Sequence, residues 1–129
     1  MRISVDQARP YFWHKDQRIG DATAADMRDE GYVYLADSGV CLAFHDMPWP
    51  GLVMVHVGAL RGAWGRAVAP AVAMLGAFWH VYAPTRILAW VRDANRAAAA
   101  FAARCGFETD GRMALPEPVT MMGWSECRF

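Results

Sequence analysis

One histidine stands in an otherwise apolar segment and is the first candidate for chemistry. His56 is the only ionisable residue between Leu52 and Leu60. An imidazole has an unperturbed pKa of about 6.5, so at neutral pH it can accept a proton directly or through a water molecule. The structural alternative is a hydrogen-bonded histidine of the core. The pattern makes His56 a candidate general base and leaves the structural role open.

A loop of small residues follows and is a candidate anion site. Residues 60–68 read Leu-Arg-Gly-Ala-Trp-Gly-Arg-Ala-Val. Small side chains let backbone N–H groups approach an anion, and a helix that begins there adds a partial positive charge. Arg61 and Arg66 can either add charge beside a phosphate or be ordinary solvated side chains. We expect the backbone around Gly65 to bind phosphate groups.

A buried strand and a long helix must position these residues. The nearly continuous apolar run from Leu52 to Val57 predicts a central strand with both faces covered. Gly58 then predicts either a β-bulge or the close approach of another backbone. The helix is expected from about Arg66 to Tyr82. Proline is tolerated in the first turn of a helix but not in its interior, so Pro70 places the helix start at residue 66 or 67.

The rest of the chain alternates hairpin signals with strand–helix–strand order, which indicates a single α+β domain over residues 1–129. The other expected elements are helices at about 7–14 (capped by Asp6) and 23–30 (capped by Thr23 or Asp21), strands at 32–36 and 40–45 joined by the turn 37–39, a strand at 86–91, a helix from its cap Asn95 to Gly106, and strands at 107–114 and 119–124 around Pro116.

The composition excludes several classes of function. Thirteen basic and thirteen acidic side chains give a formal net charge of zero, whereas nucleic-acid-coating and polybasic membrane-binding proteins need a positive surplus. The longest apolar run, Ala67 to Trp79, is too short to span a bilayer, and the first residues do not form a signal peptide. We therefore expect a soluble, cytoplasmic protein that binds neither nucleic acid nor membranes.

No metal site is expected. Cys41 and His45 are four residues apart, but a zinc site needs about four ligands. Together with Cys105 and Cys127, Cys41 gives an odd number of cysteines at no metal-binding spacing. Free thiols in a reducing compartment are the simplest interpretation.

Two segments resemble the Gcn5-related N-acetyltransferase (GNAT) family. Asn95-Arg-Ala-Ala98, followed by Gly106-Phe107 and then Gly111, is similar to the family's Asn-x-x-Ala … Gly-Phe segment and the glycine in its next turn. The loop at 60–68 matches the family's phosphate loop in part. Either Gly65 and Ala67 take the places of the two small residues, or Trp64-Gly65-Arg66 corresponds to an Arg-Gly-Lys variant. The chain resembles a short, divergent member, as phage-type members are.

The resemblance implies the GNAT fold, a central mixed and mostly antiparallel sheet with helices on both faces. It also implies an acyl-CoA-binding domain that moves an acetyl group from acetyl-CoA, without a metal, to a primary amine on a small molecule or a protein. His56 would be the catalytic base. The implied cofactor residues are Val57, Gly58 and Ala59 for the pantetheine arm, Ala63, Trp64, Gly65, Arg66, Ala67 and Val68 for the pyrophosphate, and Asn95.

One departure from the family pattern keeps a second function open. Many members carry a tyrosine seven residues after the asparagine, as an acid for the leaving thiolate, but here that position is Ala102. Cys105 is a weaker candidate for that acid. A non-catalytic GNAT-like acyl-CoA-binding or assembly protein is therefore the alternative, and a plain α+β binding domain is a third.

Two further groups of aromatic and apolar residues have open interpretations. Trp13 and Trp49 lie in irregular regions and either line the acceptor side or pack in the core. Met121, Met122 and Trp124 in the last strand either belong to the core or pair two subunits in a homodimer.

Overall fold

A sheet of eight strands and several helices make up the part of the chain that this computed structural model describes, residues 1–20, 22–114 and 117–126. The strands are β1 (Arg2–Ile3), β2 (Arg18–Ile19), β3 (Tyr32–Asp37), β4 (Val40–Asp46), β5 (Leu52–Ala59), β6 (Arg86–Arg92), β7 (Glu108–Ala114) and β8 (Pro118–Trp124). The helices are α1 (Val5–Ala8), α2 (Val68–Tyr82) and α3 (Arg96–Arg104), with short 3-10 helices at Arg9–Tyr11, Lys15–Gln17, Ala24–Asp26 and Trp64–Arg66.

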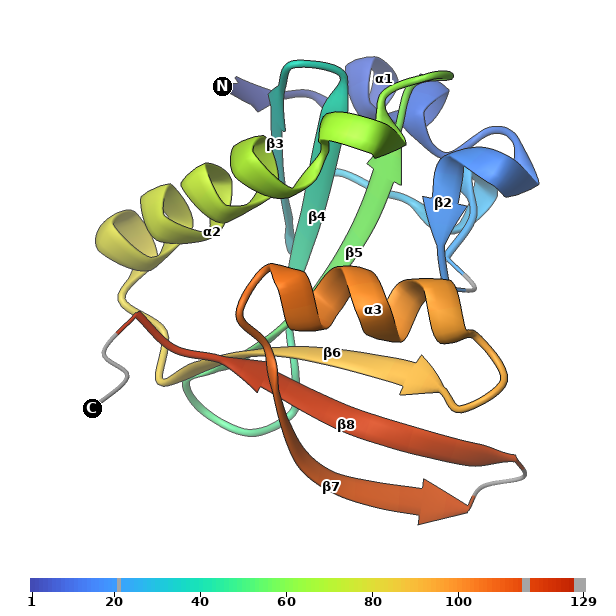
Figure 1. Cartoon of the computed structure of the whole chain (residues 1–129). Coiled ribbons are helices and arrows are strands. Elements are labelled where there is room, and N and C mark those ends of the chain that lie inside the picture. The colour runs from blue at the N-terminus through green and yellow to red at the C-terminus, as the bar shows by residue number, and fades with distance from the viewer. Residues whose placement is uncertain (21, 115–116, 127–129) are drawn as a thin grey trace.

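The sheet consists of two halves that diverge from one another. Its strand order is β1-β3-β4-β5-β6-β8-β7, and β2 pairs separately with β5. The β5–β6 pair is parallel and every other pair is antiparallel. In Figure 1, β3, β4 and β5 stand upright, whereas β6, β8 and β7 lie across the view. The predicted α+β fold with a mixed, mostly antiparallel sheet is confirmed.

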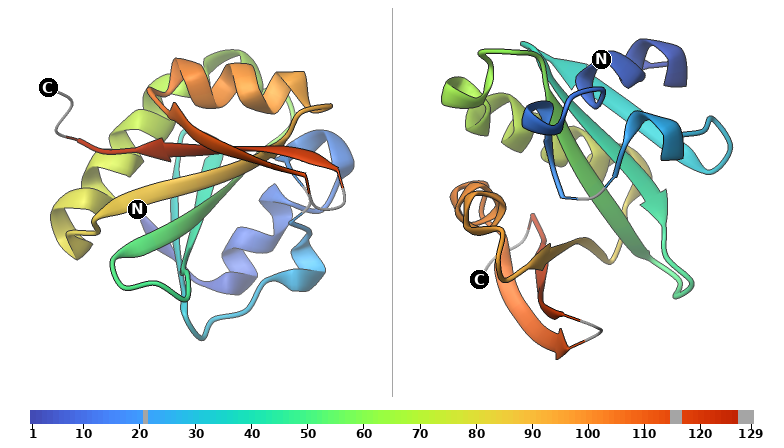
Figure 2. Two further views of the ribbon diagram at one scale, coloured as in Figure 1. Left: turned by 90° about the horizontal axis from the view of Figure 1, so that it is seen from below. Right: turned by 90° about the vertical axis from the view of Figure 1, so that its right-hand side faces the viewer.

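Helices cover both faces of the sheet, as expected. The larger core joins α2 and α3 to one face, with Phe44 of β4 stacked on Phe78 of α2 at 3.9 Å between ring centroids. The smaller core joins α1 and the segment after it to the other face, where Phe12 packs near Tyr34. Figure 2 shows α2 and α3 on one side of the strands and the N-terminal segment on the other.

Local sequence explains where the two longer helices begin. The side-chain oxygen of Asn95 accepts a hydrogen bond from Ala98 N, so Asn95 caps α3 as predicted. Pro70 is the third residue of α2 and lies in its first turn, where a missing N–H costs no helical hydrogen bond. The helix begins at Val68, later than the predicted 66 or 67, because Trp64–Arg66 forms a separate 3-10 turn.

The N-terminal region differs most from the prediction. The expected helix at 7–14 is the single turn α1 followed by a 3-10 turn, and its cap is Ser4 rather than Asp6. The expected helix at 23–30 is only the 3-10 turn Ala24–Asp26, capped at Thr23. The two-residue strands β1 and β2 were not predicted. Such short segments take their conformation from the strands that they pair with rather than from their own sequence.

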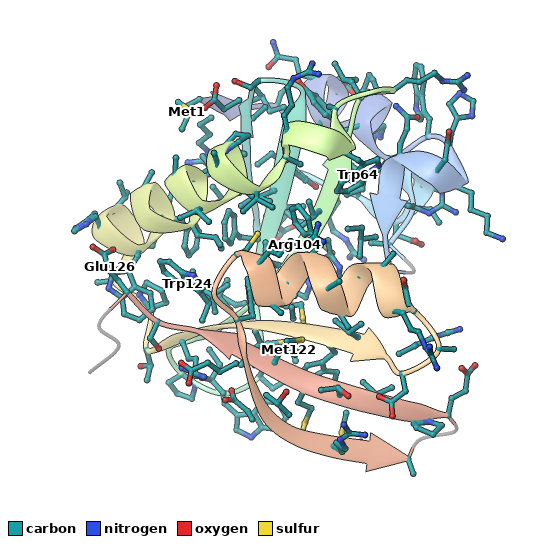
Figure 3. All side chains as sticks on the ribbon, in the orientation of Figure 1. Met1, Trp64, Arg104, Met122, Trp124 and Glu126 are labelled. Carbon is teal, nitrogen blue, oxygen red and sulfur yellow. The ribbon has the colours of Figure 1, made fainter. Side chains whose placement is uncertain are left out.

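The last strand belongs to the core. Met122 and Trp124 are buried, and the Trp124 indole donates a hydrogen bond to Cys105 O at 3.0 Å. Figure 3 shows both side chains in β8 beneath α3. The core interpretation is therefore correct for these two residues, and they offer no subunit contact. Cys41 and Cys105 are buried free thiols, while Asp21, Pro116 and Cys127 lie outside the described residues.

Candidate functional site

A cavity of about 420 Å³ lies where β5 and β6 part. The two strands pair only from Leu52 to Met54, opposite Arg86 to Leu88, and then diverge. Beyond that point the cavity reaches both sheet faces. On the α2–α3 face its wall contains small residues, including Ala71, Ala98 and Ala102, and on the opposite face it contains His56. The divergence thus creates a cavity lined by residues of both sheet faces.

His56 lies on the sheet face covered by the N-terminal segment. It pairs with Ala43 of β4, which belongs to the smaller core on that face. Burial above all, and then the neighbouring His45, lower the pKa of His56 from 6.5 to about 4, and Asp26 opposes the shift. His56 is therefore neutral at pH 7 and has a free lone pair, but it holds an added proton weakly.

His45 is the residue that sequence reasoning missed. Its Nε2 lies 3.0 Å from Nε2 of His56, and the two rings are nearly parallel. His45 pairs with Met54 and His56 pairs with Ala43, so the two histidines are diagonal neighbours on one face of the β4–β5 hairpin. The sequence predicts strands at both histidines. It could have indicated their contact only if the pairing of individual residues between the two strands had been known.

Acidic and aromatic groups surround this histidine pair. The Tyr32 ring lies against the His45 ring at a tilt of 38°, with centroids 5.0 Å apart, and Tyr32 also lines the cavity. Asp26 lines the cavity too. Its carboxylate accepts hydrogen bonds from the backbone and hydroxyl of Thr23, which lower its pKa. Asp26 therefore places a carboxylate in the cavity wall, with Arg18 and Arg28 close enough to lower its pKa further.

Gly58 does not form the expected bulge. The β4–β5 register is continuous through the Cys41–Gly58 pair. The other expectation for this glycine, the close approach of another backbone, is confirmed. A Cβ here would meet Tyr11 O at 2.5 Å and the Phe12 ring at 2.9 Å. The strand therefore departs from its neighbour because β6 turns away, and the glycine makes room for the N-terminal segment.

The free edge of β5 is shorter than the sequence suggested. Met47 N donates to Leu52 O, so even-numbered residues of β5 direct their backbone groups toward β4, and odd-numbered residues direct theirs toward the opposite edge. On that edge Ile19 of β2 pairs with Val57. Val55 is the odd-numbered residue between the last β6 pair and β2. The parallel pair of Met54 with Leu88 engages the Val55 N–H, so the Val55 carbonyl is the backbone group that a ligand can reach while β2 stays in place.

The loop at 60–68 lies outside the cavity wall. No residue from 60 to 68 contributes to the cavity wall. Gly65 is exposed, and a Cβ there would meet nothing within 4 Å. Ala63 and Ala67 are buried, and the Arg66 guanidinium donates to Gly62 O. The N–H groups of Ala63, Arg66 and Ala67 are hydrogen-bonded within the loop. In the first turn of α2, Val68 and Ala69 have N–H groups without helical partners, whereas Pro70 has no N–H.

Trp64 connects this loop to two other parts of the site. Its indole N–H donates to Asp16 O at 2.8 Å, and its ring meets Phe101 of α3 edge-on at 5.5 Å. Figure 3 shows Trp64 at the loop between α2 and the N-terminal segment. Since Phe101 lines the cavity, Trp64 stands between the exposed loop and the cavity.

The remaining candidates take different places. Asn95 lines the cavity, but its side-chain oxygen is used as the α3 cap. Ala102 and Cys105 line the inner part of the cavity. Trp13 and Trp49 are 62% and 56% exposed, so the core interpretation is wrong for both, and neither lines the cavity.

Two structural features are absent from the described residues. No helix in this part of the chain is long and apolar enough to cross a membrane. No group of three or more His, Cys, Asp or Glu side chains in residues 1–20, 22–114 and 117–126 is arranged to hold a metal ion.

Comparison with known proteins shows the fold. No protein-family model and no curated protein sequence matches the chain. Its structure is similar to that of the ribosomal-protein-S5-alanine acetyltransferase from Vibrio fischeri, with a TM-score of 0.69 and 12% identity over 96% of this chain and 90% of that one. It is also similar to a spermidine N-acetyltransferase from Vibrio cholerae (TM-score 0.61, 14% identity, 74% of this chain and 66% of that one).

A GNAT-family acetyltransferase from Bacillus anthracis is similar as well, with a TM-score of 0.57 and 15% identity over 72% of this chain and 63% of that one. The chain thus spans most of the first of these structures and somewhat under two thirds of the other two. At these identities the similarity shows a shared architecture, the GNAT fold.

Proposed function

We propose that the protein is an N-acyltransferase that moves an acetyl group from acetyl-CoA to a primary amine. The observation that carries this proposal is the cavity at the β5–β6 divergence, with His56 as a neutral base in its wall. A transferase needs a donor and an acceptor to meet at one point, and this cavity is lined by residues of both sheet faces.

The donor would bind on the face that carries α2 and α3. Its pyrophosphate would lie against the loop Ala63–Val68, where exposed Gly65 and the first turn of α2 offer backbone N–H groups. Arg61 and Arg66 are exposed nearby and add positive charge. The residues present fit an anion at this place, because nothing occupies the space above Gly65.

The pantetheine arm would run past Phe101 into the cavity and pair with the edge of β5. We predicted the backbone of Val57 to Ala59 for this role. Because β2 pairs with Val57 and Gly58, the contact is best supported at the Val55 carbonyl, and contacts at Val57 and Gly58 require β2 to move. After such a movement, the Val57 N–H on this edge would polarise the thioester carbonyl.

The acceptor would enter from the face of the N-terminal segment. There the ionised Asp26 attracts a cationic amine, and His56 can take a proton from it. The ammonium first gives one proton to water, which frees the lone pair of the nitrogen. The neutral amine nitrogen then bonds to the thioester carbon, the carbon–sulfur bond breaks with its electron pair on sulfur, and the second amine proton passes to His56. The products are an amide and a thiolate that takes a proton from water.

Cys105 is a poor acid for that thiolate. Burial raises the pKa of its thiol to about 11, above the ordinary value for a thiol. A thiol this weakly acidic does not readily give its proton to another thiolate. With Ala102 in the usual tyrosine place, the leaving group would depend on water, which predicts modest rates.

The alternative function is a non-catalytic acyl-CoA-binding protein. Two observations favour it: β2 covers part of the strand edge that the arm would use, and Ala102 offers no acid. In that case the cavity would bind the donor without transferring its acyl group.

Calorimetric titration with acetyl-CoA and with desulfo-CoA tests both functions. We expect binding in the micromolar range. No heat at millimolar ligand would rule out the enzyme and the binding protein together. If either ligand binds, release of free thiol during a screen of small amines and peptide N-termini decides between the two functions. Thiol release that depends on the acceptor supports the enzyme.

A further inference from the structure

The two paired histidines line different cavities. His56 lines the cavity at the β5–β6 divergence. His45 lines a second pocket of about 520 Å³ on the other side of the pair, together with Tyr32, Asp46 and Tyr82. Tyr32 is common to both. The Nε2–Nε2 contact therefore joins two separate spaces along one face of the sheet.

The partners of the pair determine where its hydrogens lie. The second ring nitrogen of His45, Nδ1, lies 3.2 Å from Asp46 O. A carbonyl oxygen can only accept, so His45 Nδ1 carries the hydrogen. In the neutral pair, Nε2 of His45 is then the bare nitrogen and accepts a hydrogen bond from Nε2–H of His56. This leaves Nδ1 of His56 as the lone pair available to a ligand.

His56 holds an added proton weakly, because burial and then the proximity of His45 depress its pKa. On the other side of the pair, Asp29 and Asp46 line the second pocket together with one cation, Arg2, so acidic side chains are in excess there. The other titratable groups around the pair are Asp26, Arg92 and Cys105 in the first cavity and Tyr32 and Tyr82 in the second pocket.

We propose that His45 is a relay residue for acyl transfer, which takes over the proton that His56 removes from the acceptor amine and releases it into the second pocket. This inference rests on the proposed function. As the amine proton binds His56 Nδ1, the hydrogen on His56 Nε2 moves to His45 Nε2. His56 ends as a neutral imidazole with its hydrogen on Nδ1, and His45 ends as an imidazolium.

The relay closes by proton exchange with solvent. His45 gives a proton to water in the second pocket, while the departing thiolate takes a proton from water. Exchange of ring hydrogens with water, in which His56 loses its Nδ1 proton and gains one on Nε2, then restores the starting tautomers. No oxidant, metal or further reactant is needed. The relay lets a weakly basic buried histidine act as a base, because the charge does not stay in the buried position.

The hydrogen positions can be measured without any substrate. In long-range ¹H–¹⁵N spectra of the uniformly labelled protein at pH 7.5, we expect His45 as the Nδ1–H tautomer and His56 as the Nε2–H tautomer. The opposite tautomers would overturn the relay.

Replacing His45 by glutamine separates proton transfer from positioning. A glutamine oxygen can still accept a hydrogen bond from His56 Nε2–H, but it cannot be protonated at neutral pH. At pH 7 we expect His45→Gln and His45→Phe both to lose about 10- to 100-fold in kcat with little change in the KM for acetyl-CoA. His80→Gln is the control, because His80 contacts Glu126 and lines neither cavity.

The outcomes distinguish this inference from the proposed function. Wild-type activity that His45→Gln retains and His45→Phe loses would mean that His45 only orients His56, which overturns the relay and leaves the transferase intact. A wild-type protein without any acyl transfer would instead overturn the proposed function. Equal losses in both His45 variants, with full activity in His80→Gln, support the relay.

Discussion

Gly58 of β5 lies directly against the backbone of Tyr11, so closely that a Cβ on the glycine would stand 2.5 Å from the tyrosine carbonyl oxygen. The contact joins the N-terminal segment to the strand that carries His56. Backbone cannot move aside as a flexible side chain can. The position of one face of the candidate site thus depends on the absence of a side chain at one residue.

Replacing Gly58 by alanine should therefore destabilise the protein by about 2–4 kcal/mol, as overpacking against backbone does. Chemical denaturation measures the loss. Gly76→Ala is the matched control, because a Cβ there meets nothing within 4 Å, and in the middle of α2 the change should stabilise by up to about 1 kcal/mol. Equal stabilities of the two variants would contradict the close contact.

A negative charge at Gly65 should weaken donor binding. The position is exposed and has open space, so Gly65→Asp should fold normally. The aspartate would repel a pyrophosphate at the start of α2, and we expect the Kd for acetyl-CoA to rise at least about tenfold. Gly65→Asn, which has the same shape without the charge, is the control. Calorimetry that gave the same Kd for both variants would place the pyrophosphate elsewhere.

The free energy of unfolding should depend on pH through His56. Burial, and next His45, lower its pKa in the folded protein to about 4, against 6.5 when unperturbed. Between pH 6.5 and pH 4 the unfolded chain therefore binds more protons, so stability rises with pH across this window and falls as the solution is acidified. The loss at pH 4 should be on the order of 2–3 kcal/mol.

Comparing the wild type with His56→Phe isolates this contribution. The phenylalanine ring cannot be protonated, so the difference in denaturation midpoint between the two proteins should change between pH 7 and pH 4 in favour of the variant. A difference that stays constant over this range would show that His56 does not titrate with a lowered pKa.

His56 should also be needed for turnover. His56→Gln keeps a polar side chain but removes the proton acceptor, and we expect kcat to fall by about 10²- to 10⁴-fold with little change in acetyl-CoA affinity. The same substitution at exposed His80 is the control. A normal thiol-release rate in His56→Gln would remove this residue from the mechanism.

One ion pair should stabilise the far half of the sheet. Arg86 at the start of β6 makes two 2.7 Å hydrogen bonds to the Asp110 carboxylate of β7, and both side chains are partly shielded from water. Asp110→Asn should lower stability by about 1–2 kcal/mol in thermal denaturation. The exposed pair of Arg9 and Asp6 is the comparison, and Arg9→Gln should cost less than about 0.5 kcal/mol.

Local sequence was sufficient to predict the larger elements. The apolar run at 52–57, Pro70 in a first turn and the Asn95 cap each describe interactions within a few residues, so the strand, the long helix and α3 could be predicted nearly as they are. The same holds for the α+β class. The N-terminal turns could not be predicted, because α1 and β2 are too short for periodicity to indicate them.

The sequence by itself determined the order of the elements, the lone histidine in a buried strand and the small-residue loop before the long helix. Only the tertiary structure decided that His45 meets His56, that β2 covers the edge at Val57 and that β6 turns away to open the cavity. Those features depend on the exact register between strands and on packing across the sheet. A one-residue shift would reverse every facing side chain, and nothing local to the sequence specifies that register.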